Sequence, residues 1–329
     1  MVATFFTSVI AIMAIFLFGC VGEILTEKSG HLNLGTPGIM CTGAAGAAMG
    51  AKIFIDISGG PVDVAAGLGN PFLGVLFPLL FSLLLSGLTG LLYCFLVDTL
   101  RCNQNVTGLV ITTFGAGLFQ FLGMIVCPSE DRGAFTHIGR SYFGSIFPQS
   151  FINANDFTRT FFSHGFLVYL IIAIAVASFV IIKKTRIGLN LRAVGENPGT
   201  SDASGINVIR YKYLATLIGS LISGLGGLYY LFGYNCGSME FNLESFGWIA
   251  VALVIFSIWN TGIAIAGSFI FATLYQLPLR LNVNGSLTYI VSLLPYFFTI
   301  IMLITISIFN KKETQPPSAL GLTYFREDR

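Results

Sequence analysis

The sequence predicts an all-α protein, a polytopic bundle of about nine transmembrane helices. Hydrophobic residues make up 54% of the 329 residues and charged residues only 10%, whereas about 25% of a typical soluble domain is charged. Apolar runs near or above the roughly 18 residues that cross a bilayer recur along the whole chain. Such a chain has too few charges to cover a water-facing surface, so we place it in a membrane.

The expected spans follow one another in order, with ends placed to within about 2–4 residues. They are residues 4–24, 34–55, 72–97, 105–127, 161–182, 212–233, 245–260, 262–280 and 287–309, in a range of eight to ten. Residues 1–310 then form one transmembrane domain, and residues 311–329 form a short tail.

Three of these spans have features beyond a simple apolar run. The first has no basic region before its first charge, Glu23, which indicates a retained span rather than a cleaved signal peptide. The second is rich in small residues and is either a full span or a broken, re-entrant helix. The apolar block 245–280 is divided only at Trp259-Asn260-Thr261-Gly262, a sequence typical of a tight turn.

Orientation follows from the basic segment 183–211. Lys183, Lys184, Arg186, Arg192 and Arg210 lie in it, and positive residues favour cytoplasmic loops. Alternation of the spans then places 25–33, 98–104 and the tail in the cytoplasm. The N-terminus and the segments 56–71, 128–160, 234–244 and 281–286 lie outside. Segments 56–71 and 234–244 carry acidic residues and no lysine or arginine, which agrees with this topology.

The long outer segment 128–160 is rich in aromatic residues, which argues against disorder. It is either an interfacial helix or a docking surface for an external partner. Small residues recur four apart at Gly46 and Gly50, and again at Gly219, Ser223 and Gly227. Such stripes allow close helix packing in lipid. The alternative is that these helices line a path or slide during transport.

Uncharged polar groups near the membrane are candidates for a solute path. Asn33, Asn103 and Gln104 supply hydrogen-bonding groups at span ends, and Phe114 supplies a ring for stacking. Hydrogen bonding between helices explains each amide equally well. Glu23 ends the first expected span, so we expect its charge to reach the membrane surface.

Catalytic signals are absent from the sequence. It contains no H-E-x-x-H, G-x-S-x-G or P-loop motif, so it lacks the usual means of hydrolysing ATP on its own. The six cysteines form no C-x-x-C pair, and the three histidines lack metal-ligand spacing. No series of membrane Asp, Glu or His is present to relay protons. We therefore expect no enzymatic activity, no cofactor and no metal.

Two segments resemble permease subunits of ABC importers in the ribose and branched-chain amino acid class. Residues 22–40, GEILTEKSGHLNLGTPGIM, resemble a motif of its nucleoside (basic-membrane-protein-associated) branch. Residues 188–198, GLNLRAVGENP, resemble the cytoplasmic loop that contacts the ATPase. Two departures stand out: Pro37 replaces the usual glutamate of the first motif, and Thr261 replaces a proline after Trp259-Asn260.

The resemblance implies a type II ABC importer permease in a bacterial inner membrane, with segment 183–211 as the coupling loop. Its partners would be a cytoplasmic ATPase, a second permease (the same chain or another) and an extracytoplasmic solute-binding lipoprotein, with no nucleic acid involved. Nucleosides lead as substrate, before ribose-like sugars and branched-chain amino acids. The residues implied in ATPase coupling are Arg192, Gly195, Glu196, Asn197 and Pro198.

Two other classes remain open. An ion-coupled secondary transporter would show two related halves with interrupted helices at matched positions, and no convincing internal repeat is present. A membrane scaffold without transport activity would not need polar residues directed at a common path.

Overall fold

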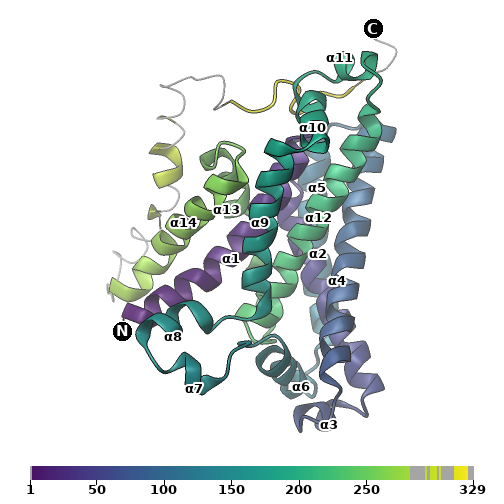
Figure 1. The fold of residues 1–329 in the computed structure, drawn as a ribbon. Coiled ribbons are helices and arrows are strands. Elements are labelled where there is room, and N and C mark those ends of the chain that lie inside the picture. The colour runs from purple at the N-terminus through teal and green to yellow at the C-terminus, as the bar shows by residue number, and fades with distance from the viewer. Residues whose placement is uncertain (1, 282–292, 295–296, 302–303, 305–314, 325–329) are drawn as a thin grey trace.

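The structure is a computed structural model, and it describes residues 2–281, 293–294, 297–301, 304 and 315–324. Helices joined by loops and turns make up these residues, without a β-strand among them (Figure 1). Seven of the helices that it describes are long and apolar enough to cross a membrane. They are α1 (Val2–Glu27), α2 (Thr36–Ile57), α4 (Pro71–Cys94, continued by η1, Phe95–Thr99), α5 (Gln104–Val126), α9 (Phe166–Lys184), α12 (Val208–Leu228, continued by η3, Tyr229–Tyr234) and α14 (Thr261–Leu281).

These helices confirm the predicted all-α membrane fold and most of its spans. The expected span 245–260 corresponds to α13 (Leu243–Phe256), an apolar helix of 14 residues. α13 and α14 are separated near Trp259, as the turn sequence predicts. The expected span 287–309 lies almost wholly outside the described residues.

Short helices fill the connections, and one of them corrects a predicted boundary. They are α3 (Pro61–Ala65), α6 (Arg132–His137) with η2 (Ile138–Tyr142), α7 (Gln149–Ile152), α8 (Asp156–Phe162), α10 (Arg186–Glu196) and α11 (Pro198–Ala203). The span expected from residue 161 begins instead at Phe166, because residues 163–165 break the helix after α8.

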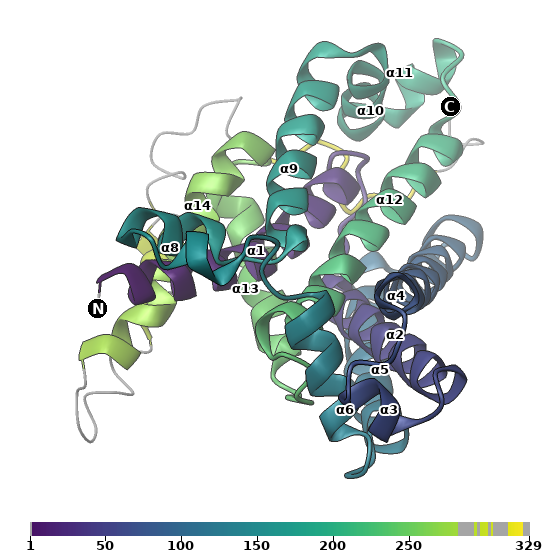
Figure 2. The same cartoon turned by 60° about the horizontal axis from the view of Figure 1, so that its bottom comes forward.

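Two groups of helices meet along α12. Figure 2 shows α1, α9, α13 and α14 on one side and α2, α4 and α5 on the other. α12 contacts α1, α2 and α4, so it joins the two groups. α2 is one continuous, largely buried helix of 22 residues, so the broken-helix alternative is wrong.

Glycines allow the helices around α2 to approach each other closely. A Cβ atom on Gly43 would lie 2.3 Å from the Gly224 carbonyl oxygen of α12, and one on Gly38 would lie 2.2 Å from the Ile111 oxygen of α5. A Cβ on Gly46 would lie 2.3 Å from the Phe81 oxygen of α4. The predicted small-residue stripes therefore serve helix packing, as small residues do in membranes.

The connections gather at two ends. The α10 end carries α10, α11, the α1–α2 loop, residues 100–103, the α13–α14 turn and residues 315–324. The opposite end, here the α6 end, carries α3, α6, α7, α8 and the loop after η3 (Figure 1). Among the described residues, loops predicted to share a side of the membrane thus lie at the same end of the bundle.

Segment 128–160, predicted to lie outside, packs onto the bundle through its aromatic residues. Phe135 and Phe143 are buried, and both stack on Phe232 of η3 with ring centroids 6.0 and 5.3 Å apart. Phe143 also stacks on Phe166 at the start of α9. Internal packing therefore accounts for part of the aromatic content, while Phe157 stays exposed.

The glycine contacts predict opposite effects on protein stability for two glycine-to-alanine substitutions. Gly43→Ala should destabilise the protein by about 1–3 kcal/mol, because its methyl group would overlap the α12 backbone. Gly117→Ala on α5 has open space around the new Cβ, and alanine favours a helix by about 1 kcal/mol over glycine. Thermal unfolding of the purified variants measures both effects. Equal stability of the two variants would contradict the packing role of Gly43.

Candidate functional site

α10 and α11 form a short helical pair that joins α9 to α12 at one end of the bundle (Figure 1). Thr185 caps α10, because its hydroxyl accepts a hydrogen bond from the Gly188 N–H at 3.2 Å. The Asn197 side chain accepts from the Thr200 N–H at 3.1 Å, and Pro198 occupies the first position of α11. The sequence Asn197-Pro198 thus ends one helix and starts the next.

Residues 315–324, here called the C-terminal strap, cross this helical pair. The Ala319 N–H donates to the Gly195 carbonyl at 3.0 Å, and the Gly321 N–H donates to the Gly30 carbonyl at 3.1 Å. The backbone of the strap therefore connects the end of α10 to the α1–α2 loop.

Side chains of the strap hold both short helices. The Ser318 hydroxyl donates to Glu196 Oε2 at 2.7 Å, and the Tyr324 hydroxyl donates to Asp202 Oδ2 at 2.9 Å. The sequence predicts only a short tail for residues 311–329 and does not predict this contact. One signal was present, since residues 315–324 carry no charge.

The structure brings the five predicted coupling residues together but gives them different surroundings. Gly195 is buried, and a Cβ atom there would lie 2.3 Å from the Lys28 carbonyl oxygen. Asn197 and Pro198 form the cap described above. Arg192 and Glu196 are exposed and line a cavity of about 500 Å³ beside the α13–α14 turn.

Two features of the α10 end were not predicted. Ile187 and Leu189 of α10 are 65% and 57% exposed, although α10 lies beyond the end of α9. Lys28 lines the same cavity as Arg192. Burial lowers the pKa of the Lys28 amine; the carboxylate of Glu196 opposes this shift, and the charge of Arg192 adds to it.

The four predicted path residues do not share one cavity. Asn33 is buried, and its side chain accepts from the Gly35 N–H at 3.0 Å, just before α2. The exposed Asn103 caps α5 by accepting from the Val106 N–H at 3.2 Å. Phe114 is 51% exposed on the outer face of α5.

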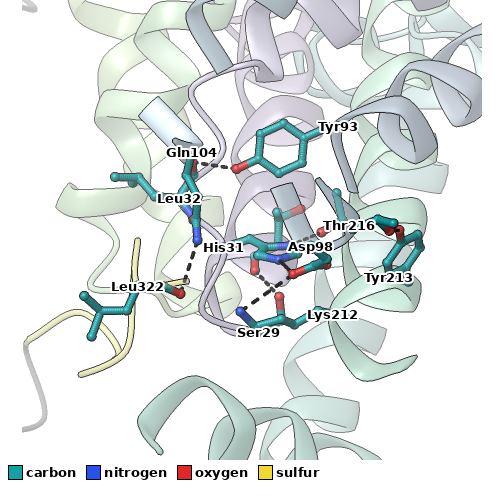
Figure 3. A network of polar contacts seen from close by, with 12 residues as sticks. Ser29, His31, Leu32, Tyr93, Asp98, Gln104, Lys212, Tyr213, Thr216 and Leu322 are labelled. Carbon is teal, nitrogen blue, oxygen red and sulfur yellow. Dashed lines mark hydrogen bonds and ion pairs between the residues drawn. The ribbon is translucent and has the colours of Figure 1, made fainter. Parts of the chain in front are cut away.

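Gln104, the fourth predicted path residue, is buried and links three segments. Its Oε1 accepts from the Leu32 N–H at 2.8 Å, and its Nε2 donates to the Leu322 carbonyl at 3.3 Å. Figure 3 shows this amide between the α1–α2 loop and the C-terminal strap. The hydrogen bonds support a structural role, and contact with solute stays a prediction.

His31 lies at the centre of a buried network (Figure 3). Its Nε2 is 2.9 Å from Asp98 Oδ1, and its Nδ1 is 2.9 Å from the Thr216 hydroxyl. A carboxylate only accepts, so Nε2 donates and Nδ1 accepts from Thr216. Burial lowers the pKa of His31, although the hydrogen bond and charge of Asp98 act in the opposite direction. The ring is therefore neutral at pH 7.

The same network contains a possible set of metal ligands. His31, Cys94 and Asp98 offer ligand atoms within 4.8 Å of one another. Both ring nitrogens of His31 are already hydrogen-bonded, and the buried Lys212 amine is 4.0 Å from the same Asp98 oxygen. A neighbouring ammonium group disfavours a bound cation, so this geometry fits a hydrogen-bond network better than a metal centre.

Glu23 and Glu27 correct the expectation of a charge at the membrane surface. α1 continues through Glu27, and the two side chains are 1% and 4% exposed. The Thr36 hydroxyl donates to Glu23 Oε2, and the Trp259 indole N–H donates to Glu27 Oε2. Sequence position alone did not reveal these partners, because Trp259 is 232 residues away from Glu27.

Comparison with known proteins establishes the family. The family described as the permease component of the branched-chain amino acid transport system matches residues 5–306. This chain belongs to that family. It is a multi-pass membrane permease of an ABC transport system, and such permeases act with an ATPase and a solute-binding protein.

Three relatives cover most of this permease. It is 29% identical to the nucleoside ABC transporter permease protein NupC of Lactococcus lactis, over 94% of this chain and 93% of NupC. It is 28% identical to the guanosine ABC transporter permease protein NupQ of Bacillus subtilis, over 84% and 79% of the two chains. It is also 28% identical to TsgC13 of Haloferax volcanii, a permease named for glucose, over 81% and 74%.

A second cavity of the permease, of about 740 Å³, lies at the α6 end. It is lined by the end of α5, by Arg132 and Thr136 of α6, and by residues 237–239 and Phe241 of the loop after η3. This cavity lies at the opposite end of the bundle from α10.

Because His31 is neutral in the folded state, we expect the permease to become less stable in acid. Its pKa in the folded state is below the ordinary value of 6.5. The unfolded chain therefore binds the proton more readily, and stability should fall as the pH drops below 6.5. His31→Gln keeps one donor for Asp98 and one acceptor for Thr216 without titrating. Thermal unfolding against pH should show a smaller acid loss in this variant, and parallel curves would contradict the assignment.

Proposed function

We propose that this permease forms the translocation path of an ATP-driven importer for nucleosides in a bacterial cytoplasmic membrane. The observation that carries the proposal is the family match over residues 5–306 together with NupC, which aligns over more than nine-tenths of both chains. NupQ, named for guanosine, supports the same substrate class. Sugars are the second candidate, because TsgC13 is named for glucose.

The α10 end faces the cytoplasm in this proposal. The lysines and arginines of 183–211 lie at this end, and positive residues favour the cytoplasmic side. Asp56, Asp63 and Glu240 belong to the opposite connections. The C-terminal strap lies at the α10 end, so the C-terminus is cytoplasmic and the N-terminus is outside.

The helical pair α10–α11 is the proposed docking site of the ATPase. It stands beyond α9 and exposes Ile187 and Leu189, two apolar side chains that a partner protein can cover. Arg192 and Glu196 border the same region with charges of both signs. Gly195, Asn197 and Pro198 set the backbone shape of the pair.

Movement of the docked pair can reach the membrane helices through the strap. The strap binds α10 at Gly195, the α1–α2 loop at Gly30 and the start of α5 through Gln104. Closure of the ATPases would then shift α10, the α1–α2 loop and α5 as connected parts. A second permease chain would complete the path along α5, where Phe114 is exposed. Asn33 and Asn103 stay secondary candidates for solute contact.

Substrate identity is tested by uptake into vesicles that contain the complete importer. Labelled guanosine and uridine should accumulate with ATP, and unlabelled nucleosides should compete. Ribose, glucose and leucine should neither accumulate nor compete. ATP-dependent uptake of glucose without uptake of nucleosides would favour the sugar alternative.

Docking is tested with two matched substitutions of exposed aliphatic residues. Ile187→Glu on α10 should reduce co-purification of the ATPase at least about tenfold, since burying a carboxylate in an interface costs more than 1.4 kcal/mol. The control Val62→Glu changes a side chain that is 79% exposed, on α3 at the α6 end, and should not change co-purification. Both variants must insert in the membrane at wild-type levels. Equal ATPase recovery with both variants would contradict docking at α10.

A further inference from the structure

Two glutamates of α1 are buried without a positively charged partner in the described part of the chain. Glu23 and Glu27 lie one helical turn apart on the same face, so their carboxyl groups interact directly. They are 1% and 4% exposed, and neither belongs to an ion pair among the described residues. Two unpaired carboxylates in such a place carry a large desolvation cost, so buried carboxyl groups of this kind are commonly neutralised.

The groups around this pair are hydrogen-bond donors. Glu23 accepts from the Thr36 hydroxyl through Oε2. Glu27 accepts from the Trp259 indole N–H through Oε2. The indole N–H can only donate, whereas the Thr36 hydroxyl can donate or accept, so Glu27 is the better supported of the two as an anion.

One oxygen of the pair has no partner. Glu23 Oε1 is fully buried and makes no hydrogen bond with any described group. Burying a carboxylate oxygen without a hydrogen-bond donor costs free energy. A protonated oxygen can instead donate to the neighbouring carboxylate. A proton bound to Glu23 Oε1 would turn this unpartnered acceptor into a donor.

A strained turn holds the donor for Glu27 in place. Ile258 and Trp259 have φ angles of 53° and 50°, and such angles are rare for bulky or β-branched residues. The surrounding structure must hold this turn in place, as strained backbone at functional sites requires. Trp259 is 8% exposed and directs its N–H to Glu27.

We propose that Glu23 and Glu27 form a proton-binding site, with one proton on Glu23 Oε1 and the negative charge on Glu27. The site joins three elements: α1, the start of α2 through Thr36, and the α13–α14 turn through Trp259. A metal ion fits less well, because the Thr36 hydroxyl and the Trp259 N–H direct their hydrogens at the carboxyl oxygens that would have to bind it. The inference does not depend on which solute the permease carries.

The proton site lies next to the coupling contacts. Lys28, which follows Glu27, presents its carbonyl to Gly195 of α10 and lines the cavity with Trp259 and Arg192. The site therefore occupies the place where movement of α10 would reach α1 and the α13–α14 turn.

Infrared spectroscopy of the full-length permease in lipid nanodiscs tests the proposal. A protonated carboxyl group gives a carbonyl stretching band that an ionised carboxylate lacks, and this band shifts in D₂O. The difference spectrum of wild type minus Glu23→Gln should contain the band. Glu27→Gln should retain it, and so should the matched control Glu240→Gln, whose side chain is exposed in the loop after η3.

Three outcomes would overturn the assignment. The first is a difference spectrum for Glu23→Gln that contains only ionised carboxylate bands. The second is loss of the protonated band in Glu27→Gln alone. The third is an increase in unfolding temperature on adding Na⁺, K⁺, Mg²⁺ or Ca²⁺ that Glu23→Gln abolishes, because it would place a metal ion at the pair.

A second measurement avoids the variants in case they fold poorly. Wild-type permease labelled with ¹³C at the glutamate side-chain carboxyl should show the protonated band at lower frequency than unlabelled protein. Such a shift assigns the proton to a glutamate, and Glu23 and Glu27 are the two glutamates that the structure describes as buried. Absence of a glutamic acid band from the wild-type spectrum would refute the proposal.

Discussion

Close backbone contact between helices around α2 is the constraint on which the rest of the structure depends. α2 lies against α4, α5, α12 and α13, and glycines allow three of these neighbours to approach its backbone. In lipid, association of helices relies on packing and hydrogen bonds because the solvent is itself apolar. Contacts at fixed glycines also set the register of each pair, so a helix cannot slide without losing several contacts at once.

This register positions the polar groups at the α10 end. The start of α2 places Thr36 against Glu23, and the loop before it places Leu32 against Gln104. The same loop gives His31 its partners on η1 and α12. The α1–α2 loop is consequently held from several sides although it has no regular structure. A movement of this loop therefore reaches α1, α2, α4, α5 and α12.

The hydrophobic pattern predicts the spans well, because each apolar run must cross the bilayer by itself. The turn near Trp259 and the cap at Asn197-Pro198 are also local, so short sequences predict them. Contacts between distant segments could not be predicted in this way. The sequence predicts a charge at the membrane surface for Glu23, because this residue is close along the chain to the expected end of the first span. Its true surroundings depend on Thr36 and on a bundle that the pattern does not describe.

The coupling segment likewise has features that its sequence predicts and features that only the fold shows. The motif at 188–198 located the segment, yet the motif does not separate Gly195, which packs against Lys28, from the exposed Arg192. Only the fold makes that distinction. The strap was missed for a similar reason, since its main signal is a lack of charge, and many unrelated segments share that property.

The strap also sets an order of assembly during synthesis. Tyr324 and its partner Asp202 are 122 residues apart, so at about 5–20 residues per second the ribosome needs roughly 6–24 seconds to connect them. During that interval α10 and α11 are already made but lack the segment that fixes them. The finished arrangement of the α10 end therefore shows that translation has passed Tyr324, and a chain truncated before this residue cannot form it.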